Sequence, residues 1–350
     1  MRTTVSTDPQ SGKSTTSRWS GLLRRAGGIS ESIHRLGISR WLEVQGRKLT
    51  SAECWFLALR KKQRGSFWES SKAFGLILPP AGHYYADPCL IKKAGTNYIF
   101  FEDNDLKARK GAIACATIGD SMAVCEPEVI LERDYHLSYP FVFEWQGEMY
   151  MIPETSANRD IELYWAREFP RRWDLMKVLM EGVNAADTTL YQHDDKFWMF
   201  TSLSRSVNSD RDDLFLYISE SPLGPWRLHP RSPVISDVSK SRPAGRLFLS
   251  DGCVVRPSQD CSSVYGRSIV LNRVIALSED DFREIPFARI LPGALGDDIR
   301  THTLSHNEDW EVRDGFKWVT KWELPIFGVR APGRTKLSFS RTKRVENAGE

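Results

Sequence analysis

The sequence lacks several signatures that would assign a function directly. It contains no HExxH, GxSxG or glycine-rich phosphate-binding motif, so hydrolysis by zinc or by a nucleophilic serine is unsupported. No apolar run approaches the roughly 20 residues that a membrane-spanning helix needs. The N-terminus also lacks the continuous apolar core of a secretory signal. We therefore expect no transmembrane segment and no secretory leader.

Cysteine is scarce, with six residues and no CxxC spacing. Several of these cysteines lie inside apolar strand patterns, where a thiol behaves as a small hydrophobic group. This usage predicts a reduced, cytoplasmic protein.

Basic residues are concentrated at the two ends of the chain, although the formal net charge is only +3. Residues 1–65 hold 13 Lys and Arg against 4 Asp and Glu, and residues 329–350 hold 6 against 2. The remaining 29 basic and 39 acidic residues leave residues 66–328 acidic. An acidic body argues against nucleic acid as a partner, because phosphates need clustered Lys and Arg.

The two ends have compositions that cannot bury much apolar surface. Residues 1–50 are rich in Ser, Thr, Arg and Gly, and we predict a disordered basic N-terminal arm there. We predict a second disordered basic tail at residues 329–350. Because Arg24 and Arg25 follow Leu22 and Leu23, a tether to an anionic membrane surface or to a partner is the alternative for the arm.

One sequence pattern occurs five times between these ends. It consists of a short apolar strand, a turn rich in Gly, Asp or Asn, and a second strand that ends in polar groups. Equivalent points in the five copies are separated by 52, 48, 57 and 57 residues; they are Asp87, Tyr139, Asp187, Ala244 and Thr301. A period of about 50 residues with alternating strands is typical of propeller blades. Residues 51–328 are therefore predicted to form an all-β, five-bladed β-propeller.

The fifth copy lacks its outer pair of strands, because a polar, basic segment begins soon after it. Two unassigned apolar segments, Cys54 to Leu59 and Lys72 to Leu78, lie just before the first copy. We predict that these N-terminal strands complete the last blade, which closes the ring and protects a sheet edge that would otherwise stay open.

Acidic side chains recur at the ends of the inner strands. In an antiparallel hairpin, the start of the first strand and the end of the second lie at one edge, which brings Asp87 close to Glu102 and Asp103. The same geometry brings Asp187 and Glu154 to a shared central funnel. Facing carboxylates are what glycosidic chemistry uses, so Asp87, Asp187 and Glu154 are the candidate catalytic residues. The alternative is that an Asp at a strand start caps the preceding turn.

Further polar and aromatic side chains near the same mouth are candidate substrate-binding residues. They are His83, Tyr85, Asp103, His136, Tyr139, Arg242, Arg256, Asp260 and His302. A structural ion pair is the alternative for Arg256. His302 either binds substrate or a metal ion or is a hydrogen-bonded structural residue.

Six phrases, taken in order, resemble the N-terminal domain of glucosamine inositolphosphorylceramide transferases, a domain also found alone in bacteria. The resemblance covers about residues 54–320 and is carried by Tyr85-Ala86-Asp87-Pro88, by His136 to Glu144, by Met151-Ile152-Pro153-Glu154, by Ser221 to Trp226, by Arg242-Pro243-Ala244-Gly245 and by Arg256 to Asp260. More distantly, the chain is similar to the five-bladed propellers of arabinanases, β-xylosidases and invertases.

That wider group places a general-base Asp on the first strand of blade one, a second Asp in blade two and an acid Glu in blade three. Asp87 matches the first position, whereas Tyr139 stands at the second and Asp187 replaces the Glu, so the set is incomplete by position. Glu154 is a substitute from a different strand. We expect no cofactor, and calcium on the channel axis is the open alternative because some similar propellers hold it there.

We therefore expect a carbohydrate-active, glycosidase-like propeller that acts on a glycan or glycoconjugate, with Asp87 as base or nucleophile, Asp187 as acid and Glu154 as modulator or substitute acid. The alternative is a non-catalytic glycan-binding module that serves a partner enzyme in polysaccharide or glycolipid biosynthesis. In the plant transferases the transfer activity is associated with a separate C-terminal domain, so glycosyl transfer is not carried over. A protein-interaction propeller would instead present a hydrophobic surface.

Overall fold

The computed structural model describes residues 51–63, 65, 68, 73–204, 212–295, 298–320 and 346–347. The predicted basic arm at 1–50 lies outside the described residues, as does the predicted tail at 329–350 except for its two residues at 346–347. The chain divides into two compact units, Met1–Ala52 and Glu53–Glu350, and the description that follows concerns the second. Among the described residues, no helix is long and apolar enough to cross a bilayer.

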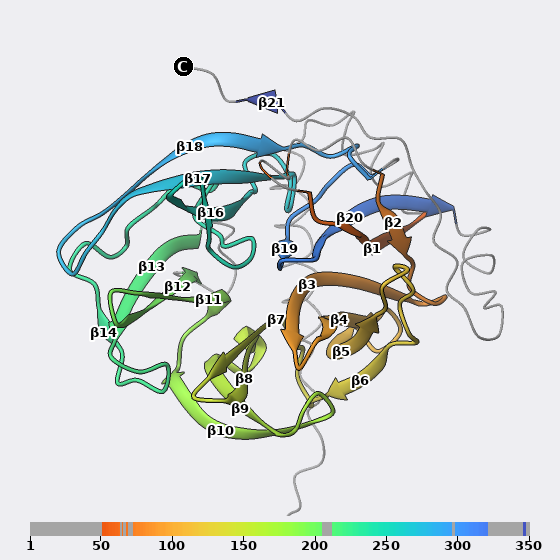
Figure 1. Cartoon of the computed structure of the whole chain (residues 1–350), viewed down its shortest axis with the longest axis horizontal. Coiled ribbons are helices and arrows are strands. Elements are labelled where there is room, and N and C mark those ends of the chain that lie inside the picture. Colours follow the sequence, from red (N-terminus) through yellow and green to blue (C-terminus); the bar gives the residue numbers. More distant parts are fainter. Residues whose placement is uncertain are drawn as a thin grey trace, which may run out of the picture. The chain divides into compact units, whose positions relative to one another are not determined.

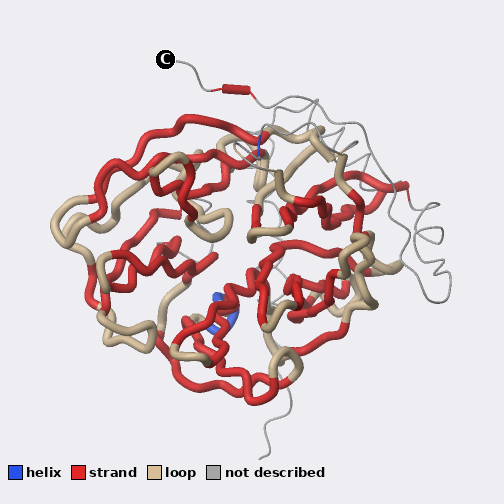
Figure 2. The backbone as a smooth tube through the Cα atoms, viewed as in Figure 1, coloured by secondary structure: helices blue, strands red, loops and turns tan. Residues whose placement is uncertain are grey.

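Five β-sheets surround a common centre, as Figures 1 and 2 show. The first blade contains β3 (His83–Lys93), β4 (Thr96–Asp105), β5 (Lys110–Ile118) and β6 (Glu128–Leu131). The second contains β7 (Ser138–Trp145), β8 (Glu148–Glu154), β9 (Asp160–Glu168) and β10 (Arg172–Glu181), with a 3₁₀ helix, η2 (Ser156–Asn158), between β8 and β9. The third contains β11 (Ala185–His193), β12 (Lys196–Ser204), β13 (Asp212–Ser219) and β14 (Arg227–Leu228). The predicted five-bladed propeller is thus confirmed.

The fourth and fifth blades contain the strands that close the ring. The fourth contains β15 (Phe248–Ser250), β16 (Cys253–Asp260), β17 (Ser268–Leu277), β18 (Phe282–Ile290) and, from the far C-terminus, β21 (Glu346–Asn347). The fifth is built from both ends of the propeller, in the order β19 (Leu304–His306), β20 (Trp310–Thr320), β1 (Ser51–Lys61) and β2 (Gly75–Ile77). The predicted closure by N-terminal strands is confirmed, and β1 and β20 lie side by side in Figure 1.

A buried ion cluster joins the two ends of the chain inside the fifth blade. Arg60 of β1 donates from Nε to Glu311 of β20 at 2.7 Å, and Arg313 donates from Nε to the other oxygen of Glu311 at 2.6 Å. All three side chains are buried. Removing one member of such a group leaves an uncompensated buried charge. The cluster therefore stabilises the pairing of β1 with β20.

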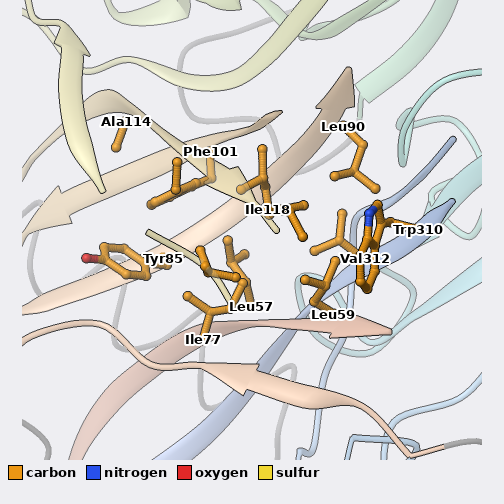
Figure 3. Close-up of a cluster of buried hydrophobic side chains, with 13 residues drawn as sticks. Leu57, Leu59, Ile77, Tyr85, Leu90, Phe101, Ala114, Ile118, Trp310 and Val312 are labelled. Atoms are coloured by element: carbon orange, nitrogen blue, oxygen red, sulfur yellow. The ribbon is translucent and has the colours of Figure 1, made fainter. Parts of the chain in front are cut away.

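The apolar core lies between neighbouring blades. In Figure 3, Leu57 and Ile77 of the fifth blade pack with Phe101 of the first blade. Phe100 faces the opposite side and packs with Val142 in the cluster shared with the second blade. Successive side chains of a strand point to opposite faces, so a blade strand buried on both faces reads as a continuous apolar run.

The inner strands of the first three blades are interrupted by β-bulges. The pairing register shifts between Ala86 and Cys89, and the corresponding shifts in β7 and β11 enclose Tyr139 and Asp187. Asp87, Tyr139 and Asp187 have φ values of 53°, 41° and 54°. A left-handed residue other than glycine costs about 1–2 kcal/mol, and such strain concentrates at functional sites. Three of the five repeat points predicted from the sequence therefore coincide with places where the backbone redirects a side chain.

Candidate functional site

Polar side chains from all five blades lie close enough to influence one another's charge, and we call them the mouth cluster. Its members are Asp87, Glu102, Glu154, Asp187, Asp212, Arg242, Gln259, His302 and Asp314. The cluster has two halves, one around His302 and one around Arg242.

The first half joins the first and fifth blades. Asp87 accepts a hydrogen bond from the Thr303 hydroxyl at 2.8 Å, and the same oxygen lies 3.2 Å from Nε2 of His302. Nδ1 of His302 lies 2.8 Å from Asp314, whose other oxygen accepts the backbone N–H groups of His302 and Thr303. His302 therefore lies between two buried carboxylates.

These contacts determine the charges in this half. Burial disfavours the imidazolium, but the charges of Asp314 and Asp87 outweigh it and raise the pKa of His302 well above its ordinary value. Burial likewise disfavours the ionised form of Asp87, yet His302 and the Thr303 hydroxyl lower the pKa of that carboxyl. Asp87 is therefore an ionised carboxylate beside an imidazolium.

The second half joins the second, third and fourth blades around Arg242. Asp187 accepts from Nε of Arg242 at 2.6 Å and from the Gln259 amide at 2.8 Å. The same guanidinium reaches Asp212 at 3.3 Å and Glu154 at 3.4 Å. Burial, followed by the charges of Glu154 and Asp87, raises the pKa of Asp187 well above its ordinary value, although Arg242 opposes this. Arg242 shares its single positive charge among three carboxyl groups. This charge does not keep Asp187, the most buried of the three, ionised.

Glu102 on β4 is a further buried carboxyl of the first blade. Its Oε1 accepts from the Tyr84 hydroxyl at 3.1 Å and from the Asn104 amide at 3.0 Å, and lies 3.4 Å from Nε2 of His136. Burial and then the charge of Asp87 raise the pKa of Glu102 to about 8. Nδ1 of His136 accepts the Gly111 N–H at 2.9 Å, so a neutral His136 ring carries its proton on Nε2, facing Glu102.

The predicted candidates of the first two blades differ in where they lie. Asp103, chosen from the sequence beside Glu102, points the other way and bonds Nδ1 of the half-buried His83 at 2.7 Å. Tyr85 lies in the core rather than with the polar groups, with its ring 3% exposed and 4.7 Å from that of Phe101 (Figure 3). Tyr139 is buried, and its hydroxyl bonds that of Thr189 across to the third blade at 2.8 Å.

The two remaining candidates of the fourth blade are held in ion pairs. Arg256 is buried and donates to Glu284 at 2.7 Å, which is the structural alternative considered for it. Asp260 is buried against Arg289 and Arg267 and also accepts the Ser262 N–H at 3.0 Å. Within the part of the chain that the structure describes, neither side chain hydrogen-bonds to the mouth cluster.

The sequence analysis did not identify Asp212, Asp314 or Tyr265, whose ring centroid lies 5.2 Å from that of His302. Asp314 lies opposite Thr303, so the hairpin rule applied to the fifth copy would have found it. Tyr265 lies in the loop between β16 and β17, where no periodic pattern points to a role.

Asp87, His302 and Asp314 have the spacing of a possible metal site, because one ligand atom from each lies within 4.8 Å of the others. Calcium prefers six to eight oxygen ligands. Here both ring nitrogens of His302 face carboxylates, so a protonated ring already supplies the positive charge. This donor set does not fit calcium.

The chain matches a known protein family over most of the propeller. Residues 79–295 match the family model described as "Glucosamine inositolphosphorylceramide transferase 1, N-terminal". The protein of that name from Oryza sativa subsp. japonica is 34% identical over 255 residues, which cover 71% of this chain and 32% of the relative. The Arabidopsis thaliana protein is 34% identical over 212 residues, or 59% and 28%. The chain thus spans about a third of the length of these curated relatives.

Solved glycoside hydrolase structures show a looser likeness. Zg3597, a family 117 glycoside hydrolase from Zobellia galactanivorans, is 14% identical with a TM-score of 0.47, covering 81% of this chain and 95% of that one. A thermostable family-43 glycoside hydrolase is 17% identical with a TM-score of 0.45, covering 57% and 74%. A likeness at this level assigns no activity.

The family match covers more than half of the residues of this chain. The chain therefore belongs to the family of the N-terminal domain of glucosamine inositolphosphorylceramide transferase 1.

Proposed function

We propose that this propeller binds a glycan or glycoconjugate at the mouth cluster and hydrolyses a glycosidic bond there. One observation carries the proposal: Asp87 and Asp187 occupy equivalent bulges, and the pKa of Asp87 is lowered while that of Asp187 is raised. Two carboxyls whose surroundings drive their pKa values apart are suited to act as base and acid.

In the proposed reaction, the ionised Asp87 removes a proton from water as the water oxygen bonds to the anomeric carbon. The glycosidic carbon–oxygen bond breaks, and the leaving oxygen takes the proton from Asp187. The same two groups serve a double displacement when Asp87 itself attacks the anomeric carbon. Glu154 modulates the acid, because it shares Arg242 with Asp187.

Side chains that are only partly buried around the cluster bind the hydroxyl groups. His136, beside Glu102, exposes about a third of its side chain, and Arg242 exposes about a fifth. Their donors match sugar hydroxyls, which both donate and accept hydrogen bonds.

A second candidate is a non-catalytic glycan-binding module. Asp87 and Asp187 are each in contact with a cation and are only 5% and 1% exposed, which favours a structural or binding role for the pair. The curated relatives are about three times as long as their match and are named transferases. In this version, the propeller holds a sugar chain for a partner enzyme of glycan assembly.

The test is to measure turnover and binding of aryl glycosides and cell-surface oligosaccharides by the wild type and by Asp87→Asn and Asp187→Asn. Loss of a proton-transfer group should cut turnover about 10²–10⁴-fold, whereas Asp194→Asn, at an exposed turn, should leave it unchanged. Binding without turnover by all proteins supports the module. No binding and no turnover by the wild type sinks both versions.

We also propose that the protein works in the cytoplasm. All six cysteines are free, and burial raises the pKa of Cys54 to about 11, which keeps that thiol protonated and unreactive. Cys125 is exposed and is the natural reporter. Labelling of Cys125 in intact cells by a membrane-impermeant maleimide would contradict a cytoplasmic location.

A further inference from the structure

We propose that Tyr265 is a stacking platform that holds an uncharged or positively charged sugar ring over the mouth cluster. The inference rests on the proposed saccharide function and adds to it a contact residue and a charge class for the ligand.

Tyr265 is a partly exposed aromatic residue that contacts both cations of the mouth cluster. It is 44% exposed. Its ring centroid lies 5.2 Å from that of His302, and the guanidinium carbon of Arg242 lies over the ring at 5.2 Å. A single exposed aromatic side chain is ordinary on a protein surface. Tyr265 differs because it lies beside His302 and Arg242, the partners of Asp87 and Asp187. Trp55 also meets the ring edge-on, with the two centroids 6.5 Å apart. The exposed part of the residue therefore lies next to the partners of the two candidate catalytic carboxyls.

The loop that carries Tyr265 is fixed at both ends. Gly266 has a φ of 64°, and a Cβ there would lie 3.0 Å from the Cβ of His302 and 3.1 Å from Trp55. The Gly266 carbonyl accepts the Thr301 N–H at 3.0 Å. At the other end, Cys261 donates its N–H to Val238 at 3.1 Å. A platform held in this way loses little conformational entropy when it binds a ligand.

An aromatic face carries partial negative charge and attracts positively polarised groups. The C–H bonds on one face of a sugar ring are such groups, and an ammonium substituent is attracted more strongly. A tyrosine ring beside hydrogen-bonding groups thus meets the apolar face of a sugar while those groups meet its hydroxyls.

The charges of the mouth cluster select against an anionic ligand. Arg242 contacts three carboxylates and His302 contacts two, so carboxylates outnumber cations in both halves. Protonation of Asp187 removes one negative charge but leaves an excess. A uronate or phosphate group would meet repulsion in a partly desolvated site.

The test measures binding of arrayed neutral, amino-substituted and uronic acid oligosaccharides to the wild type, Tyr265→Phe, Tyr265→Leu and Tyr265→Ala. Phe keeps the aromatic face and should bind within about twofold, whereas Leu and Ala should bind about tenfold more weakly. Leu keeps most of the bulk, so it separates a lost aromatic face from a collapsed loop. The matched control is Leu249→Ala, at a side chain 70% exposed, which should not change binding.

Each result decides one part of the inference. If Leu and Ala bind as tightly as the wild type, the platform is wrong and the saccharide function stands. If the wild type prefers uronic acid oligosaccharides, the charge class is wrong. If the wild type binds no member of the array, the saccharide function and the platform fail together.

Discussion

Asp87 and Asp187 occupy the same backbone position in two blades, yet their surroundings give them opposite protonation preferences. Both lie on bulges, with φ values of 53° and 54°, and both are buried. Asp87 meets an imidazolium and a hydroxyl donor, whereas Asp187 meets a guanidinium that two other carboxylates also contact. The backbone thus sets where each carboxyl lies. Burial raises the pKa of both, and the charges and hydrogen-bond donors around each carboxyl decide whether that effect is overcome.

The fourth blade shows where this pattern stops. Beside its predicted repeat point, Ala244, the residue of positive φ is Gly245, with φ of 127°. A Cβ on Gly245 would lie 1.9 Å from the carbonyl oxygen of Leu304. The fourth and fifth blades approach too closely there for any side chain to fit. The fourth blade therefore supplies no carboxyl at the position that Asp87 and Asp187 occupy in the first and third blades.

Replacing His302 by Leu should have the largest effect on the Asp87 half. It leaves Asp87 and Asp314 buried without their cation, which should lower the free energy of unfolding by about 4 kcal/mol at pH 6. The raised pKa of His302 means that the imidazolium stabilises the fold below about pH 6.5 and that this contribution is lost as pH rises through its folded pKa. The cost should therefore shrink above neutral pH in urea titrations.

His193→Gln is the matched control for that experiment, because His193 contacts the exposed Asp194. It should cost under about 1 kcal/mol. A cost for His302→Leu that stays constant from pH 6 to pH 10 would contradict the buried imidazolium.

Gly245→Ala tests the close approach that ends the pattern. The added methyl group meets backbone, which cannot move aside as a side chain can, so we expect a loss of about 3 kcal/mol or more. Gly252→Ala also has a positive φ but no atom within 4 Å, and it should cost only about 1 kcal/mol. Equal melting temperatures for the two variants would refute the steric account.

Arg242→Gln tests the Asp187 half. It removes the cation that three carboxylates share, and because Arg242 is about one fifth exposed, water replaces part of the loss. We expect a cost of about 2 kcal/mol in chemical denaturation. Arg267→Gln, about half exposed beside Asp260, is the control and should cost under about 1 kcal/mol. A larger loss of stability for Arg267→Gln than for Arg242→Gln would show that burial does not determine which of the two ion pairs stabilises the fold more.

Glu102→Gln should change the pH dependence of stability more than stability itself. The pKa of Glu102 is raised from 4.5 to about 8, so its protonated form stabilises the fold fully below pH 4.5, and that contribution is lost as pH rises through about 8. The wild type should lose up to about 1.4 kcal/mol per pH unit in this window from this group alone. Gln mimics the protonated form, so the variant should have a flatter profile. Identical slopes for the two proteins would mean that Glu102 is ionised in the fold.

Several features were predictable because they depend on local periodicity. The repeat of about 50 residues placed Asp87, Tyr139 and Asp187 at equivalent points, and the structure finds a bulge at each. The missing outer strands of the last copy predicted ring closure, which the order β19-β20-β1-β2 confirms. The hairpin rule named both Glu102 and Asp103, but it could not say which of the two adjacent side chains turns inward.

The sequence by itself determined the blades, their number and the strands that close the ring, because alternating apolar residues and turn residues act over a few positions. Only the tertiary structure decided the charges of the mouth cluster and the place of Tyr265. Those depend on partners from other blades, such as His302 for Asp87 and Arg242 for Asp187, which are 215 and 55 residues away along the chain. Burial then amplifies each of these contacts, because charges interact more strongly where water is excluded.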